Sequence, residues 1–254
     1  MLELKGVTKN FSGLTALSEI DLRVEPGSIK GLIGPNGAGK TTLFNVVTGV
    51  FPPSRGQVLF QGKPLSGLPA DRIAKRGVFR TFQHPHLFKS LTVLENTLLG
   101  CHRFDRSGFW ACGLQTPAAK KEARRAGAKA LKHLEMLGLD PVKDQLAGSL
   151  PLGRQRYVEI CRALAAEPEL LLLDEPTAGL NDRETEDFKE LTFRIRDLGV
   201  TLFVIEHHMK FIMDVCDHIA VLNFGELIAT GSPREIQESP AVIEAYLGIE
   251  EEID

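Results

Sequence analysis

The sequence is poor in cysteine and has no long apolar run. Its four cysteines form no Cys-x-x-Cys pair, which excludes a disulfide scaffold and favours reduced thiols in a cytoplasmic protein. The longest unbroken apolar stretches, such as 170–173, fall far short of the roughly 18 residues that span a bilayer. The N-terminus also lacks the apolar segment of a signal peptide. We therefore expect a chain that does not cross a membrane by itself.

An excess of charge of one sign is missing as well. The 30 Lys and Arg residues and the 33 Asp and Glu residues give a net charge of −3, so no overall basic field indicates a nucleic-acid partner. Hydrophobic residues make up 43% and charged residues 25% of the chain, which excludes a disordered or collagen-like chain. At roughly 150 residues per domain, the length corresponds to between one and two domains.

Strand patterns at both ends of the chain enclose a helical block. Ile20, Leu22 and Val24 alternate with charged residues, which predicts a half-buried strand, and the mostly apolar stretch 29–33 predicts a strand buried on both faces. We expect further strands at 57–61, 78–83, 170–174, 201–205, 217–222 and 226–229, and helices at 39–47, 92–100, 117–137 and 153–166. These elements indicate a mixed α/β domain that the helical block interrupts.

The stretch from Gly34 to Thr41 fits the pattern G-x-x-x-x-G-K-[ST] of a phosphate-binding loop. An apolar strand precedes it and a helix follows, so backbone N–H groups and the helix N-terminus can face a polyanion. We expect Lys40 to reach the β- and γ-phosphates and the Thr41 hydroxyl to bind Mg²⁺. The candidate nucleotide-binding residues here are Gly34, Pro35, Asn36, Gly37, Ala38, Gly39, Lys40, Thr41 and Thr42.

Two carboxylates follow the apolar strand 170–173. Open α/β sheets place ligands at the carboxyl ends of their strands, and adjacent strand residues point to opposite faces. Asp174 therefore suits Mg²⁺, directly or through water, and Glu175 suits activation of the attacking water. Without the phosphate loop, such a pair would more often be a helix cap or a solvated turn.

Residues 150–163, LPLGRQRYVEICRA, open a helix directly upstream of this acidic strand. Here the sequence resembles the nucleotide-binding subunits of ABC transporters, whose signature peptide is LSGGQ in its common form. Leu150, Pro151, Gly153 and Arg154 lie in the aligned stretch, in which only the first Leu and the second Gly match. The resemblance spans nearly the whole chain.

This resemblance implies a fold and a division of the chain. It implies a P-loop NTPase core with a mixed sheet, an antiparallel β part at the N-terminus and an inserted helical subdomain. The ATP-binding core would comprise 1–91 and 167–254, and the helical subdomain 92–166.

The resemblance also implies roles for four residues that would otherwise be unremarkable. Phe11 matches the aromatic that stacks on adenine, although an isolated Phe would by default belong to a core. Gln83 matches the glutamine that contacts Mg²⁺ and the attacking water. His207 matches the histidine that bonds the γ-phosphate, and His208 is interpreted as a bystander. Asn181 ends the loop that crosses to the opposing subunit, where the family usually has Asp.

Three segments are similar to the branched-chain amino acid importer ATPases within this family. They are the tail 239–248, the stretch 205–210 and the insertion that begins at 104–110. The related lipopolysaccharide-export ATPase has a similar tail but usually lacks the insertion. A non-transport ATPase of the iron–sulfur assembly type is the alternative from a different class.

The resemblance implies membrane permease partners and a second ATPase subunit, identical or paralogous. The two subunits would pair head to tail and enclose two ATP molecules with Mg²⁺, at the cytoplasmic face of the membrane. A periplasmic or extracellular solute-binding protein would act indirectly, and no nucleic acid is expected. The apolar residues of 84–89 predict a permease-binding surface. The stripe of Lys121, Arg125, Lys129 and Lys132 is either a solvated helix face or a contact with anionic lipid.

Overall fold

The computed structural model describes residues 1–101 and 116–247. These residues form two compact units. The first unit comprises Met1–Arg80 and Glu169–Asp254, and the second comprises Thr81–Pro168. The predicted insertion at 104–110 and the final residue of the 239–248 tail lie outside the described residues.

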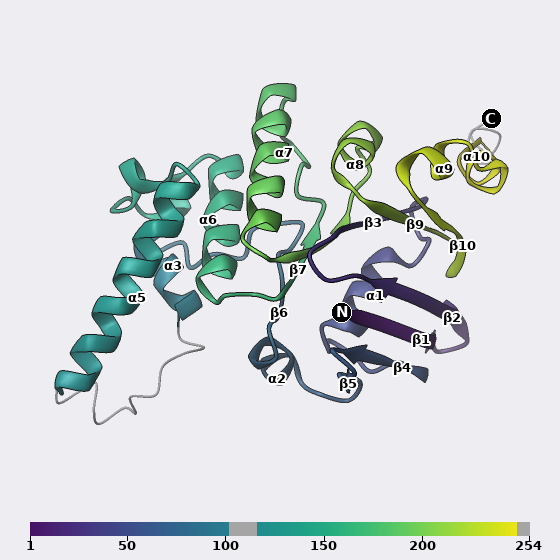
Figure 1. The fold of residues 1–254 in the computed structure, drawn as a ribbon, viewed down its shortest axis with the longest axis horizontal. Coiled ribbons are helices and arrows are strands. Elements are labelled where there is room, and N and C mark those ends of the chain that lie inside the picture. Colours follow the sequence, from purple (N-terminus) through teal and green to yellow (C-terminus); the bar gives the residue numbers. More distant parts are fainter. Residues whose placement is uncertain (102–115, 248–254) are drawn as a thin grey trace. The chain divides into compact units, whose positions relative to one another are not determined.

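A mixed six-stranded sheet organises the first unit (Figure 1). Its order is β10 (Glu226–Gly231), β9 (His218–Asn223), β3 (Ile29–Ile33), β8 (Thr201–Ile205), β7 (Leu170–Asp174) and β6 (Val78–Arg80). Only β10 runs antiparallel to its neighbour. Strands β3, β7 and β8 are buried along their whole length, as parallel strands covered on both faces should be. The predicted bounds of these three strands are confirmed.

The same unit contains an antiparallel sheet of order β2 (Leu14–Val24), β1 (Leu2–Phe11), β4 (Arg55–Phe60) and β5 (Lys63–Pro64). Ile20, Leu22 and Val24 are buried while the charged residues between them are exposed, which confirms the predicted alternation. One apolar core joins the two sheets through α1 (Lys40–Val47). At its centre the rings of Phe44 and Phe203 lie 5.0 Å apart.

The remaining helices of the first unit were not anticipated from the sequence. They are α2 (Ala70–Lys75), α7 (Asp182–Asp197), α8 (Met209–Val215), α9 (Pro233–Gln237) and α10 (Pro240–Leu247). A usable signal was present for α7, because Asn181 and Glu184 form a reciprocal capping box at its N-terminus.

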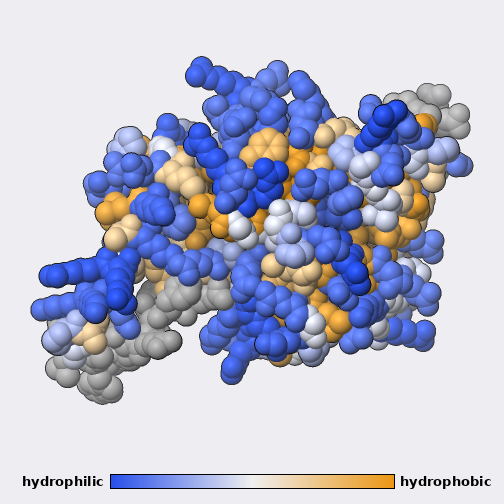
Figure 2. Space-filling view, in the orientation of Figure 1, coloured by the Kyte–Doolittle hydropathy of each residue, from blue (hydrophilic) through white to orange (hydrophobic). Residues whose placement is uncertain are grey.

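The second unit is helical, as predicted. It contains α3 (Val93–Cys101), α5 (Pro117–Met136) and α6 (Leu152–Ala165), with short 3-10 turns at Asp140–Val142 and Ala147–Ser149. Thr116 caps α5 by accepting a hydrogen bond from the Ala119 N–H, and Pro117 is the first helical residue. Hydrophilic side chains dominate along much of α5 in Figure 2. In this helix Lys129 forms an ion pair with Glu167 at 2.8 Å.

The strand predicted at 78–83 extends well past the observed one. The strand expected at 78–83 ends at Arg80, whose last pairing is with Leu172 on β7. The chain then leaves the sheet at Thr81, where the second unit begins. The compact units divide at 80/81 and 168/169, whereas the sequence division falls at 91/92 and 166/167. As an assignment of domains, that division stays a prediction.

No helix in the described ranges is both long enough and apolar enough to cross a bilayer. The described cysteines Cys101, Cys161 and Cys216 are buried thiols. Burial raises the pKa of the Cys161 thiol to about 12, which suppresses its reactive thiolate form.

Candidate nucleotide-binding and hydrolysis site

The predicted phosphate loop connects β3 to α1 and is built on glycines that tolerate no side chain. Gly34 and Gly39 adopt φ angles of 148° and 103°, which L side chains rarely adopt. A Cβ on Gly34 would lie 2.0 Å from the Leu222 carbonyl oxygen, and one on Gly39 would lie 2.6 Å from that of Ala16. The loop therefore takes its shape because strands β9 and β2 pack directly against it.

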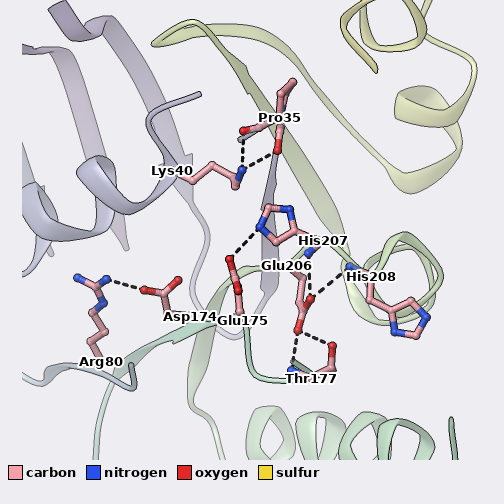
Figure 3. Close-up of polar contacts among 10 residues, drawn as sticks. Pro35, Lys40, Arg80, Asp174, Glu175, Thr177, Glu206, His207 and His208 are labelled. Carbon is pink, nitrogen blue, oxygen red and sulfur yellow. Dashed lines mark hydrogen bonds and ion pairs between the residues drawn. The ribbon is translucent and has the colours of Figure 1, made fainter. Parts of the chain in front are cut away.

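Lys40 lies at the start of α1 and folds back over this loop (Figure 3). Its Nζ donates hydrogen bonds to the carbonyl oxygens of Gly34 at 2.6 Å and Pro35 at 2.8 Å. Burial lowers the pKa of Lys40, and the nearby carboxylates of Glu175 and Asp174 oppose that shift. The side chain is thus a confined cation beside two carboxylates, which suits it to a polyphosphate.

A hollow of about 590 Å³ opens over the phosphate loop within the first unit. Asn36–Thr42, Phe11, Glu175, His207 and Phe224 are among the residues that line it. The hollow therefore brings together four elements that the sequence analysis identified separately. Its volume lies within the range of small-molecule sites.

Two exposed aromatic rings border the hollow. Phe11 exposes 40% of its surface and packs edge-on against Phe51, with ring centroids 5.1 Å apart. Phe224 exposes 87% and lies in the β9–β10 turn at a positive φ of 45°. That turn is fixed to the phosphate loop, since the Gly225 N–H donates to the Ala38 carbonyl oxygen at 3.0 Å. Sequence analysis gave Phe224 no role.

Asp174 ends β7, and its carboxylate forms a buried ion pair. Its Oδ2 lies 2.5 Å from a guanidinium nitrogen of Arg80, which also donates to the Asn45 side chain at 2.6 Å. Both the hydrogen bond and the ion pair with Arg80 involve Oδ2 and not Oδ1. One carboxylate oxygen is thereby held in place while the other suits a hard cation.

The chemistry of two oxygen donors at this site fits Mg²⁺ bound together with a nucleotide. No group of three or more His, Cys, Asp or Glu residues in the described parts of the chain could hold a metal. Mg²⁺ in nucleotide sites is typically held by one or two protein oxygens together with phosphate oxygens and water. The Thr41 hydroxyl and the Asp174 carboxylate are oxygen donors of this kind.

Glu175 and His207 form the polar pair expected for water activation. Nε2 of His207 lies 2.8 Å from Oε1 of Glu175 (Figure 3). The pairing follows from the sheet, because β7 and β8 are neighbours and the Glu175 N–H extends their ladder to the Ile205 carbonyl oxygen at 2.9 Å. Glu175 also has a positive φ of 47°, a strained conformation that is frequent at active sites.

Gln83 lies in the second unit, in a loop attached to α6. Arg156 donates to the Gln83 carbonyl oxygen at 3.1 Å. The Glu159 carboxylate accepts from the backbone N–H groups of Phe82 at 3.4 Å and His86 at 3.0 Å. Burial raises the pKa of Glu159, and these two backbone hydrogen bonds oppose the shift.

The signature stretch forms the N-terminus of α6. Pro151 is the N-cap, one position before the first helical residue, and Leu150 is buried. The first-turn N–H groups, including those of Gly153 and Arg154, have no intrahelical acceptor. The Arg154 side chain donates to the Gly138 carbonyl oxygen at 3.4 Å. Asn181, in the first unit, caps α7 by accepting from the Glu184 N–H at 3.0 Å.

The strand–loop–helix at β3, the acidic end of β7 and the histidine after β8 define a P-loop nucleoside-triphosphate hydrolase. The family model "ABC transporter" matches residues 17–178, and a second model, "Branched-chain amino acid ATP-binding cassette transporter", matches residues 226–252. The chain belongs to the ABC transporter family and is an ATP-hydrolysing subunit of it.

Similar proteins match along nearly the whole length. The chain is 44% identical over 249 residues to the high-affinity branched-chain amino acid transport ATP-binding protein BraF of Pseudomonas aeruginosa, and 42% identical to LivG of Escherichia coli K12. Each match covers 98% of both chains. A solved nucleotide-free ATP-binding cassette of an ABC transporter matches with a TM-score of 0.84 and 32% identity, over 97% of this chain and 98% of that one. The predicted family and fold class are confirmed.

Proposed function

We propose that this chain hydrolyses ATP to power an importer of branched-chain amino acids. The similarity to BraF and LivG and the match of the C-terminal family model support this assignment. The lipopolysaccharide export ATP-binding protein LptB of Haemophilus influenzae is also similar but less so, at 33% identity over 249 residues. The observation that carries the hydrolytic role is the Glu175–His207 pair beside Lys40 in one hollow.

In this proposal the residues of the site divide binding and hydrolysis between them. Lys40 and the loop N–H groups bind the phosphates, and Phe11 stacks on the adenine. Glu175 accepts the proton of the attacking water, and His207 orients that water and donates to the γ-phosphate. Thr41 and Asp174 hold Mg²⁺, which neutralises charge on the phosphates when bound. The role of Gln83 toward Mg²⁺ and water rests on the family pattern.

We further propose that two ATPase subunits pair head to tail. A structurally similar cassette, at 26% identity and a TM-score of 0.78, was solved as a dimer in a post-hydrolysis state with ADP and Pi. The contacts from the opposing subunit would come from Leu150, Pro151, Gly153, Arg154 and Asn181. Because Pro151 has neither hydroxyl nor N–H, the backbone N–H groups around Gly153 would meet the γ-phosphate.

The permease-binding surface belongs to the same proposal. Phe88 lies within the stretch 84–89 and exposes 57% of its surface, and Phe82, just before the stretch, exposes 40%. Exposed apolar groups of this kind mark partner sites. A permease helix bound there would hold the subunit at the cytoplasmic face of the membrane, as a peripheral protein.

Reconstitution with the permease subunits and a solute-binding protein tests the transported solute. Proteoliposomes should take up labelled leucine, isoleucine or valine in an ATP-dependent manner, and a Leu87→Glu, Phe88→Glu double variant should bind ATP but not assemble. Uptake that is equally fast for unrelated amino acids, or assembly only with an exporter, would overturn the branched-chain assignment without affecting the hydrolytic one.

A further inference from the structure

Glu206 is a buried carboxylate to which the proposed mechanism gives no role. It directly follows β8 and precedes His207, and only 3% of its surface is exposed. A buried carboxylate is costly unless hydrogen bonds satisfy its oxygens. The hydrogen-bond donors around the Glu206 carboxylate therefore indicate what this side chain does.

Each oxygen of Glu206 holds a different loop (Figure 3). Oε1 accepts hydrogen bonds from the backbone N–H and the hydroxyl of Thr177, at 2.6 and 2.5 Å. Oε2 accepts from the backbone N–H groups of His207 at 2.9 Å and His208 at 3.3 Å. One side chain thus binds the loop after β7 and the loop after β8 at once.

These two loops carry the residues that the proposed mechanism pairs. Thr177 lies two residues after Glu175, and His207 is the neighbour of Glu206. The β7–β8 ladder reaches Glu175, whose N–H donates to the Ile205 carbonyl oxygen, and Thr177 and His207 lie beyond this contact. The positions of the Glu175 carboxylate and the His207 ring therefore depend on what holds the loops past that point.

We propose that Glu206 is a positioning residue that sets the distance between Glu175 and His207 by tying their loops together. This inference rests on the proposed roles of those two residues in hydrolysis. An ionised carboxylate suits the task because it only accepts hydrogen bonds, and all four partners are donors. A glutamine amide in the same place can accept hydrogen bonds through its oxygen only. Its NH₂ group would face backbone N–H groups on the other side and could not bond to them.

The test is steady-state ATP hydrolysis by the purified full-length Glu206→Gln variant. The amide must release one loop, so kcat should fall by about tenfold to a hundredfold, the scale of a misplacement of roughly 1 Å at a reacting group. The KM for Mg-ATP should stay within about twofold, since the phosphate loop makes none of these contacts. A merely structural role would instead lower the amount of folded protein and leave the kcat of the folded fraction unchanged.

A second pair of variants tests the contact that Glu206 makes with Thr177. Thr177→Ser keeps the hydroxyl and should hydrolyse ATP like the parent, whereas Thr177→Val loses one of the four donors and should lower kcat by a few fold. The charge-matched control is Asp217→Asn. Among the described residues the Asp217 carboxylate accepts one hydrogen bond, from the Ile29 N–H at 2.8 Å. An amide oxygen can also accept it, so kcat should not change.

The outcomes separate this inference from the proposed function. If Glu175→Gln abolishes hydrolysis while Glu206→Gln retains the parent kcat, the positioning role of Glu206 is overturned and the proposed hydrolytic roles stand. If Glu175→Gln itself hydrolyses ATP normally, the proposed function fails first. A Glu206→Gln variant that raises KM in proportion to the loss of kcat/KM, with kcat intact, also overturns the positioning role.

Discussion

Both units contain a buried glutamate that accepts hydrogen bonds from backbone N–H groups of a loop with a proposed catalytic residue. The two glutamates are placed differently in the fold. Glu206 of the first unit lies in the loop itself and binds two loops, those of Glu175 and His207. Glu159 of the second unit lies inside helix α6 and binds one loop, on both sides of Gln83.

The comparison shows two ways to hold a catalytic loop. In the first unit two neighbouring strands set the loops side by side, and Glu206 fixes their remaining freedom. In the second unit helix α6 supports the Gln83 loop through Arg156 and Glu159. The same helix begins at the signature residues, so the Gln83 loop and the signature share one rigid element.

The largest expected effect tests the chemistry assigned to the first unit. Glu175→Gln should lower turnover by about a hundredfold or more, the scale of losing a general base, while ATP still binds and a closed dimer accumulates. Lys40→Ala should lose ATP binding instead. Nucleotide binding by fluorescence and hydrolysis by phosphate release separate the two, and near-normal hydrolysis by Glu175→Gln would remove the assignment.

The second effect tests whether the start of α6 faces nucleotide in the working dimer. Gly153→Asp should abolish hydrolysis, because its carboxylate would oppose the γ-phosphate. Pro151→Ser is the matched control and should preserve or modestly raise the activity, since the usual signature has a hydroxyl there. Hydrolysis at the parent rate by Gly153→Asp would contradict the head-to-tail arrangement.

A smaller effect concerns the two aromatic rings of the hollow. Phe11→Ala should weaken ATP binding by about fivefold to a hundredfold, because stacking of a base on an aromatic ring contributes roughly 1–3 kcal/mol. Phe224→Ala should weaken it by a similar or smaller factor if its exposed ring also contacts the base. Isothermal titration with ATP measures both, and Phe193→Ala, on α7 outside the hollow, should leave the affinity unchanged.

The smallest effect is a difference in pH dependence at the glutamate of the second unit. Burial raises the pKa of Glu159 above its ordinary value, so the folded protein binds this proton more tightly than the unfolded chain does. The resulting stability is fully present below the ordinary pKa and is lost as the pH rises through the folded pKa. Denaturant unfolding should therefore show the parent losing stability relative to Glu159→Gln as the pH rises. If the difference in free energy of unfolding between the parent and Glu159→Gln did not change with pH, the raised pKa would be contradicted.

Much of the first unit's site could be predicted because its signals are local. The phosphate loop, Asp174, Glu175 and His207 each follow a recognisable apolar strand, and the sheet brings those strand ends together. The contacts of Glu206 with Thr177 could not be predicted, because they join residues 29 positions apart and no local pattern records them. The ion pair of Arg80 with Asp174 was missed for the same reason. The strand at 78–83 was predicted too long, because the chain leaves the sheet at Thr81 although β7 continues to Asp174.

The placement of β3 has a consequence for biosynthesis. The strand that leads into the phosphate loop pairs with β8 and β9, both of which lie beyond residue 200. The turn after β9 also supplies the Gly225 N–H that bonds to the loop. During translation the phosphate-loop sequence therefore emerges long before either neighbour of its strand exists. In a nascent chain that apolar strand stays without its neighbours until the residues beyond 200 are synthesised. The ATP pocket is therefore one of the latest features to form, and the unpaired strand must be protected from aggregation until then.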